Sequence, residues 1–153
     1  MIVFSYHHNN TEKIAEVFAN ALDSEIKTPQ QANPEEIKQN DLVGFGAGID
    51  SGKHYKVLLD FADNLPQVDN KKAFIFSTAG VTGDKKREED HSTLRQKLQS
   101  KGYTIVDEFQ CKGFNTNSFL KIFGGMNKGR PNAEDLVHAE EFATNLKQNK
   151  HAT

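Results

Sequence analysis

Short apolar runs alternate along this chain with longer segments in which apolar residues recur at helical spacing. The runs at 2–5, 41–46 and 72–77 are apolar on both alternating faces, which is typical of strands buried within a parallel sheet. Residues 24–27 and 103–109 add an edge strand and a last strand. This alternation predicts an α/β fold in three layers, a doubly wound, five-stranded parallel sheet between two layers of helices.

Five helices are expected between and after these strands. The first has Asn9, Asn10 and Thr11 as candidate N-cap residues, and the second begins at Asn33 with a proline in its first position. Apolar residues spaced three and four apart define the others. The expected helical ranges are 11–22, 33–37, 53–65, 89–100 and 132–146.

Size and composition narrow the function classes. A chain of 153 residues with 36% hydrophobic content is expected to form one domain over residues 1–150. A net charge of -2 argues against nucleic-acid and anionic-membrane binding, and the mixed charge run at 85–90 indicates a solvated helix start. No run approaches the roughly 20 apolar residues of a membrane span, and no secretory leader is evident, so we expect a cytoplasmic protein.

The cysteine and histidine content bears on metal and redox chemistry. Cys111 is the only cysteine, which excludes an intramolecular disulfide and a cysteine-rich metal centre, and it is expected to be a small packed side chain. The six histidines show no ligand spacing. The sequence therefore predicts no metal site and no catalytic residue.

The loop after the first strand carries the side chains of an anion site. Hydroxyl and amide groups lie where the N–H groups of a helix N-terminus converge, an arrangement that favours a phosphate. No lysine or arginine occurs between Ser5 and Thr11, so neutral donors would hold the phosphate, aided by protonated histidine. The candidate phosphate-binding residues are Ser5, His7, His8, Asn9, Asn10 and Thr11.

Two further loops rich in small residues follow the second and third long strands, at 46–52 and 77–83. Ligands of doubly wound sheets bind beyond the carboxyl ends of the strands, so the three loops are expected to meet there. The glycine-rich run of the first of these loops matches neither of two familiar nucleotide motifs. Ile49 replaces the third glycine of G-x-G-x-x-G, and His54 replaces the Ser or Thr of a Walker loop.

The first loop resembles the phosphate loop of the flavodoxin-like family. Its order is apolar strand, Ser5-x-x-x-Asn9-x-Thr11, then helix, against the family's S/T-x-x-G-x-T, so it has one additional residue. Residues 46–55 and 77–80 are similar to the two loops that enclose the flavin ring in that family. The resemblance covers essentially the whole chain. It implies a flavodoxin-like sheet with strand order 2-1-3-4-5 and bound FMN.

The resemblance implies a set of residues around the flavin ring. Glycines at 46, 48 and 80 would allow close backbone approach, although they could instead serve tight turns. Asp50 and Ser51 could bond the flavin or cap the next helix, and Tyr55 could stack on the ring or pack with Leu58. The predicted ring-binding residues are Gly46, Ala47, Gly48, Ile49, Asp50, Ser51, His54, Tyr55, Ser77, Thr78, Ala79 and Gly80.

The resemblance implies an FMN-binding electron-transfer protein that works with redox partner proteins or with a small-molecule electron donor or acceptor. An alternative is an FMN-dependent oxidoreductase using NAD(P)H or a quinone, in which the glycine-rich segment 113–130 helps to cover the substrate. A third possibility is a flavin-free fold retained for protein interaction.

Overall fold

A parallel sheet forms the middle layer of the computed structural model, which describes residues 1–5, 10–113 and 129–151. The parallel strands run in the order β2-β1-β3-β5-β6, which confirms the predicted order 2-1-3-4-5. A sixth strand, β4 (Lys53–His54), pairs antiparallel with β3 and was not predicted. The parallel strands are β1 (Ile2–Phe4), β2 (Ile26–Lys27), β3 (Leu42–Asp50), β5 (Lys71–Ala79) and β6 (Tyr103–Lys112).

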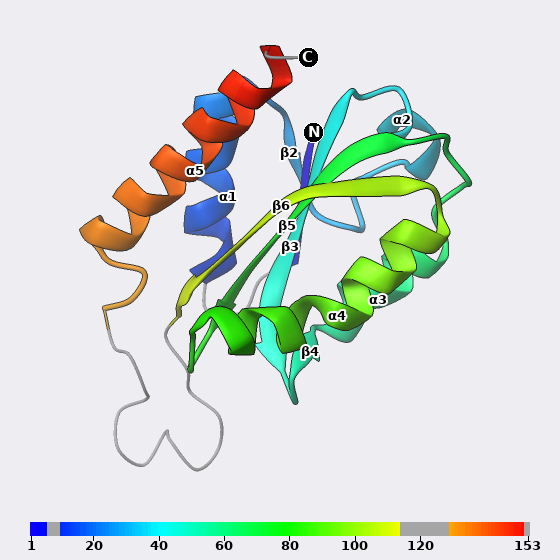
Figure 1. Cartoon of the computed structure of the whole chain (residues 1–153). Helices are drawn as coiled ribbons and strands as arrows, with labels where there is room; N and C mark the ends of the chain where they lie inside the picture. Colours follow the sequence, from blue (N-terminus) through cyan, green and yellow to red (C-terminus); the bar gives the residue numbers. More distant parts are fainter. Residues whose placement is uncertain (6–9, 114–128, 152–153) are drawn as a thin grey trace.

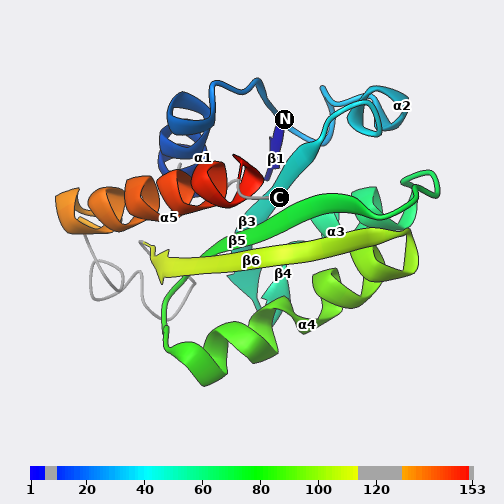
Figure 2. The same ribbon diagram turned by 45° about the horizontal axis from the view of Figure 1, so that its top comes forward.

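Helices cover both faces of the sheet, as Figures 1 and 2 show, with α1 and α5 on one face and α3 and α4 on the other. The short α2 has the predicted Asn33 cap, whose side chain accepts a hydrogen bond from the Glu35 N–H. None of the described helices has the length and apolar character needed to cross a membrane. The helices are α1 (Asn10–Leu22), α2 (Pro34–Ile37), α3 (Lys56–Asp63), α4 (Asp84–Ser100) and α5 (Ala133–His151).

Alternate residues of β5 supply the two halves of the core. Ile75 packs with Phe45 and with the apolar stripes of α3 and α4, whereas Phe74 and Phe76 pack with Phe18 of α1. The Phe18 ring meets Phe74 and Phe76 edge-on, at centroid separations of 5.5 and 5.0 Å. Edge-to-face contacts of this kind are favourable beyond the burial of area. Strand β5 is therefore packed on both faces of the sheet, from Ala73 to Phe76.

Strand β3 is longer than the sequence pattern indicated, and this changes the second predicted loop. It continues to Asp50 and returns as β4 through Ser51 and Gly52, whose φ angles of 53° and 78° match a two-residue hairpin turn. Helix α3 consequently begins at Lys56 rather than at 53. The expected N-cap role of Asp50 or Ser51 is wrong, because Tyr55 occupies that position.

The glycines of β3 make room for aromatic rings. A Cβ added at Gly44 would lie 2.3 Å from Phe74 Cζ, and one at Gly46 would lie 2.2 Å from Phe76 Cε2. At Gly48 the nearest atom would be Cε2 of Tyr55, at 2.7 Å. Gly46 and Gly48 lie within β3, so the alternative that they serve only tight turns is wrong for these two, whereas Gly80 follows the end of β5.

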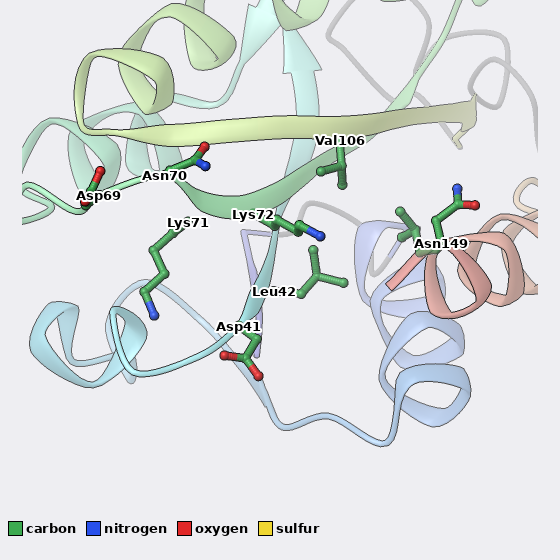
Figure 3. A pocket seen from close by; sticks show the side chains of 9 residues that line it. Asp41, Leu42, Asp69, Asn70, Lys71, Lys72, Val106 and Asn149 are labelled. Carbon is green, nitrogen blue, oxygen red and sulfur yellow. The ribbon is translucent and has the colours of Figure 1, made fainter. Parts of the chain in front are cut away.

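A cavity of about 440 Å³ lies at the amino ends of β3 and β5, beside the last turns of α5 (Figure 3). Leu42, Val106 and Leu146 form its apolar part. The Lys72 side chain runs between Val106 and Leu42. Ligands in this class of fold bind at the opposite, carboxyl edge of the sheet. The cavity is therefore separate from the three loops identified in the sequence.

Candidate functional site

Three consecutive residues at the end of β5 hold the segments that carry the predicted cofactor residues. The carbonyl of Phe76 bonds to the β3–β4 hairpin, the Ser77 hydroxyl bonds to α4, and the Thr78 hydroxyl bonds to the start of α1. Ser77 and Thr78 point to opposite faces of the sheet because side chains alternate along a strand. The carboxyl edge of the sheet is thus fixed from both faces at once.

The phosphate side of the site begins where α1 meets β5. Thr11 Oγ1 and Thr78 Oγ1 are 3.0 Å apart, and both residues are buried. Asn10 is also buried, and its amide lies against Gly113, where an added Cβ would be 3.0 Å from Asn10 Nδ2. The Ser5 N–H donates to the Gly46 carbonyl at 2.9 Å, which joins β1 to β3 at this edge.

The structure therefore brings Ser5, Asn10 and Thr11 to the same edge of the sheet as Thr78. His7, His8 and Asn9 lie outside the described residues. Backbone N–H groups in the first turn of a helix have no partner within the helix, so α1 adds donors to these side chains. This neutral donor set fits a phosphate group.

His54 is an internal anchor of the hairpin. Its Nε2–H donates to the Phe76 carbonyl at 3.0 Å, and Nδ1 has no partner within the described part of the chain. Burial, together with the nearby His91, lowers the pKa of His54 to about 3, so the ring is neutral at physiological pH. The His54 and His91 rings lie 4.9 Å apart between centroids, although the sequence had shown the histidines only as scattered residues.

The exposed part of the hairpin offers a different set of groups. Asp50 and Ser51 are exposed at its tip, whereas Ala47 is buried within β3 and Ile49 is half-buried. The half-buried Tyr55 lies against Gly48 and packs on the core cluster that contains Leu58. Burial raises the pKa of the Tyr55 phenol, and the charge of Asp50 adds to this shift. Of the two alternatives for Tyr55, the one in which it packs with the apolar stripe is confirmed.

A buried hydrogen-bonded relay joins β5, α4 and β6. Ser77 Oγ is 2.7 Å from His91 Nε2, and His91 Nδ1 is 2.8 Å from Glu108 Oε1. Arg95 donates to both oxygens of Glu108, at 2.7 and 2.8 Å. Burial alone would raise the pKa of Glu108, but the hydrogen bonds from His91 and Arg95 outweigh it and lower this pKa to about 2. The carboxylate is therefore ionised.

Gln110 and Glu108 set the directions of two hydrogen bonds in the relay. Gln110 Nε2 donates to Ser77 Oγ at 3.1 Å and to Asp90 at 2.9 Å, so the Ser77 hydroxyl is free to donate to His91. A carboxylate can only accept, so His91 Nδ1–H donates to Glu108 Oε1. Serine, histidine and carboxylate occur in this order in hydrolase triads. Here Ser77 and His91 are fully buried, which gives a substrate no access, so the relay ties β5 to α4.

Sequence reasoning missed His91, Glu108 and Asp90. Asp90 falls in the run at 85–90 that was expected to be solvated, yet it is fully buried and paired with Lys86. Glu108 and Gln110 alternate along β6, which puts both on one face. The spacing of Glu108 and Gln110 was the only sequence signal for these contacts. It identifies their partner only once the register is known, in which Ser77 lies opposite Gln110.

Other reactive groups have structural roles. Cys111 is buried in the cluster around Phe18, as expected, and burial raises the pKa of its thiol to about 12. Across residues 1–5, 10–113 and 129–151, no three His, Cys, Asp or Glu side chains are placed to hold a metal ion.

The remaining predicted ring-binding residues are Ala79 and Gly80. Ala79 ends β5, and Gly80 begins the loop that follows it.

Comparison with known proteins identifies the fold and the family. The uncharacterized protein MJ0298 of Methanocaldococcus jannaschii is 47% identical over 145 residues, covering 95% of both chains. Oxidised flavodoxin 2 of Bacillus cereus matches with a TM-score of 0.70 and 19% identity over 97% of this chain and 98% of that one. The flavodoxin of Streptococcus pneumoniae TIGR4 also gives 0.70, with 17% identity over 97% of each.

The sequence model of the flavodoxin domain matches residues 1–151, which is nearly the whole chain. This domain points to FMN as the cofactor. The neutral donors at the start of α1 are compatible with its phosphate. On this evidence the chain belongs to the flavodoxin family.

Proposed function

We propose that this protein binds one FMN noncovalently and carries electrons between redox partners in the cytoplasm. The observation that supports this best is the convergence of α1, the β3–β4 hairpin and the end of β5 at the carboxyl edge of the sheet. Open α/β sheets bind their ligands at this edge. Family membership makes FMN the ligand to test first.

In this proposal each segment has a distinct task. Ser5, Asn10 and Thr11, with the first-turn N–H groups of α1, hold the phosphate through neutral donors. The exposed Asp50 and Ser51 of the hairpin, with residues 79–80, border the ring. Bound FMN supplies the redox chemistry itself, and the chain supplies orientation and hydrogen bonds.

The buried relay and His54 would act behind these contacts. His54 holds the hairpin to Phe76, and His91 holds Ser77 to α4, so both fix backbone that borders the proposed ring site. A site built on fixed strands keeps its geometry better than one on free loops. We assign these two histidines to positioning rather than to cofactor contact.

One observation supports a second candidate, an FMN-dependent oxidoreductase. Residues 77–83 contain no aromatic side chain, and Val81 in this loop is 59% exposed. A ring bordered by such a loop would have one face less covered. A nicotinamide or quinone could then stack on that face as electron donor or acceptor.

The visible spectrum of the purified protein, with and without added FMN, tests both candidates. Flavin absorbance, or quenching of FMN fluorescence at one equivalent, is the expected result. Absence of FMN binding would contradict both and leave the flavin-free interaction fold. Steady-state oxidation of NADH or NADPH with a quinone then separates them, because an electron carrier should turn over negligibly without a reductase.

A further inference from the structure

The hydroxyls of Thr11 and Thr78 form a buried pair with one unused hydrogen. Their oxygens are 3.0 Å apart, and the residues are 0% and 4% exposed. A hydroxyl has one hydrogen to donate and two lone pairs to accept. One of the two hydrogens makes the contact within the pair. The other meets no acceptor among the residues that the structure describes.

The surroundings of this pair favour an anionic acceptor without a basic side chain. Thr11 lies in the first turn of α1, a helix of 13 residues, where N–H groups and the helix dipole create positive potential. Lys13 is exposed, and the Arg130 guanidinium is engaged by both Asp135 oxygens, at 2.5 and 2.6 Å. The hydroxyl pair can therefore contribute a hydrogen bond to a bound anion without a salt bridge.

We propose that Thr78 is a positioning residue for the phosphate of FMN. Its hydroxyl donates to Thr11 Oγ1, so the Thr11 hydroxyl is left to donate its own hydrogen to a phosphate oxygen at the start of α1. Accepting one hydrogen bond strengthens a hydroxyl as a donor of the next. Thr78 itself does not touch the cofactor. This inference rests on the proposed function, because it takes FMN as the ligand.

The location of Thr78 explains why it can act in this way. It lies on β5 between Gly48 of β3 and Cys111 of β6, so its backbone is held by strands on both sides. Its neighbour Ser77 is tied to His91 on the other face of the sheet. A hydroxyl on such a fixed backbone gives Thr11 one orientation instead of several.

The test compares FMN with riboflavin, which lacks the phosphate. Apoprotein of the full chain is titrated with each flavin, and affinity is followed by flavin fluorescence. Thr78→Val should weaken FMN binding about tenfold, the scale of a hydrogen bond to a charged group, and leave riboflavin affinity unchanged. Thr78→Ser, which keeps the hydroxyl, should retain most of the FMN preference. The 31P shift of bound FMN should change in Thr78→Val alone.

Thr104→Val is the matched control, because it removes a hydroxyl bonded to Asn70 at the other end of the sheet. It should behave as the wild type. Thr78→Ala removes the same hydroxyl and replaces Thr78→Val if circular dichroism shows that variant to be unfolded. Equal losses for FMN and riboflavin, or an unchanged ratio, would overturn the inference while FMN binding stands. Failure of the wild type to bind FMN would overturn the proposed function and this inference together.

Discussion

Single glycines decide whether the aromatic rings of the core fit against β3. Gly46→Ala puts a Cβ 2.2 Å from Phe76 Cε2. That ring is fully buried and has the rings of Phe18 and Phe74 as neighbours, so it has little room to move away. We expect a loss of about 1–3 kcal/mol in the free energy of unfolding, the usual cost of overpacking. Urea denaturation followed by circular dichroism measures it.

The control for that substitution is Gly52→Ala at the hairpin tip. No atom lies within 4 Å of an added Cβ there, so only the positive φ of 78° opposes it. The cost should be about 1 kcal/mol from backbone strain. A larger loss at Gly52 than at Gly46 would contradict the packing explanation.

Glu108 is the residue on which the buried relay depends. Glu108→Gln removes the charge that Arg95 binds through two hydrogen bonds and weakens the acceptor for His91. The side chain is 17% exposed, and we expect a loss of about 1–3 kcal/mol, as for a hydrogen-bonded charge that loses its partner.

The exposed ion pair between Lys56 and Asp60 serves as a control for the substitution at Glu108. Asp60→Asn breaks the contact between Lys56 and Asp60, whose side chains are 85% and 53% exposed. Pairs of this kind contribute about 0–1 kcal/mol. Chemical denaturation of both variants at pH 7 should therefore separate them, and equal losses would show that the relay adds no stability.

At the scale of elements, β6 is a long edge strand with built-in protection against pairing. Ala73 pairs with Ile105 and Phe74 with Asp107, so Val106 is a bulge with no partner in the register. The Glu108 N–H donates to the Asp107 carboxylate. Bulges and charges at sheet edges discourage added strands. Asp107→Val should therefore increase concentration-dependent association, measured by sedimentation velocity.

Glu89→Val tests whether added apolar surface alone has this effect. Glu89 is exposed on α4, where no strand edge is available. We expect it to remain at the wild-type association state. If both variants associate equally, the edge of β6 is not the cause.

The elements also show where sequence reasoning succeeded and where it could not. Strong apolar runs such as Ala73 to Phe76 predicted the central strands, because burial on both faces leaves a local signature. Strand β4 has only two residues, and its pairing with Ile49 and Asp50 is set by the hairpin turn, which left no periodic pattern. The sequence placed Gly46 and Gly48 in a loop. They lie within β3, where they make room for the rings of Phe76 and Tyr55.

At the scale of the whole molecule, topology was predictable because each strand and helix alternates in the chain. The candidate site was only partly predictable from the sequence. Strand ends placed Ser5, Thr11 and Thr78 at one edge, but the proximity of His54 to His91 depends on how α4 packs on the sheet. Contacts between residues far apart in sequence, such as those of Glu108, depend on the register of β6 on β5. The sequence alone did not predict that register.

The buried His54 and the partly buried Glu108 together predict how the stability of the fold responds to acid. The pKa of His54 falls from 6.5 to about 3 on folding, so the unfolded chain binds more protons than the folded one between these values. Stability should then decrease as pH falls below about 6.5, by up to about 1.4 kcal/mol per pH unit for one proton. Glu108, lowered from 4.5 to about 2, stabilises above its unfolded pKa and loses this contribution as pH falls toward 2.

Urea unfolding at a series of pH values from 8 to 4 measures this dependence, and His54→Gln isolates the histidine. That variant should have lower stability at pH 7.5 but a shallower decline between pH 6.5 and 4.5, because no buried imidazole has to remain neutral. His138→Gln, an exposed position on α5, should keep the wild-type slope. Equal slopes in the wild type and His54→Gln would mean that His54 is not the group that opposes acid, and the hairpin would then be held mainly by its turn and its pairing with β3.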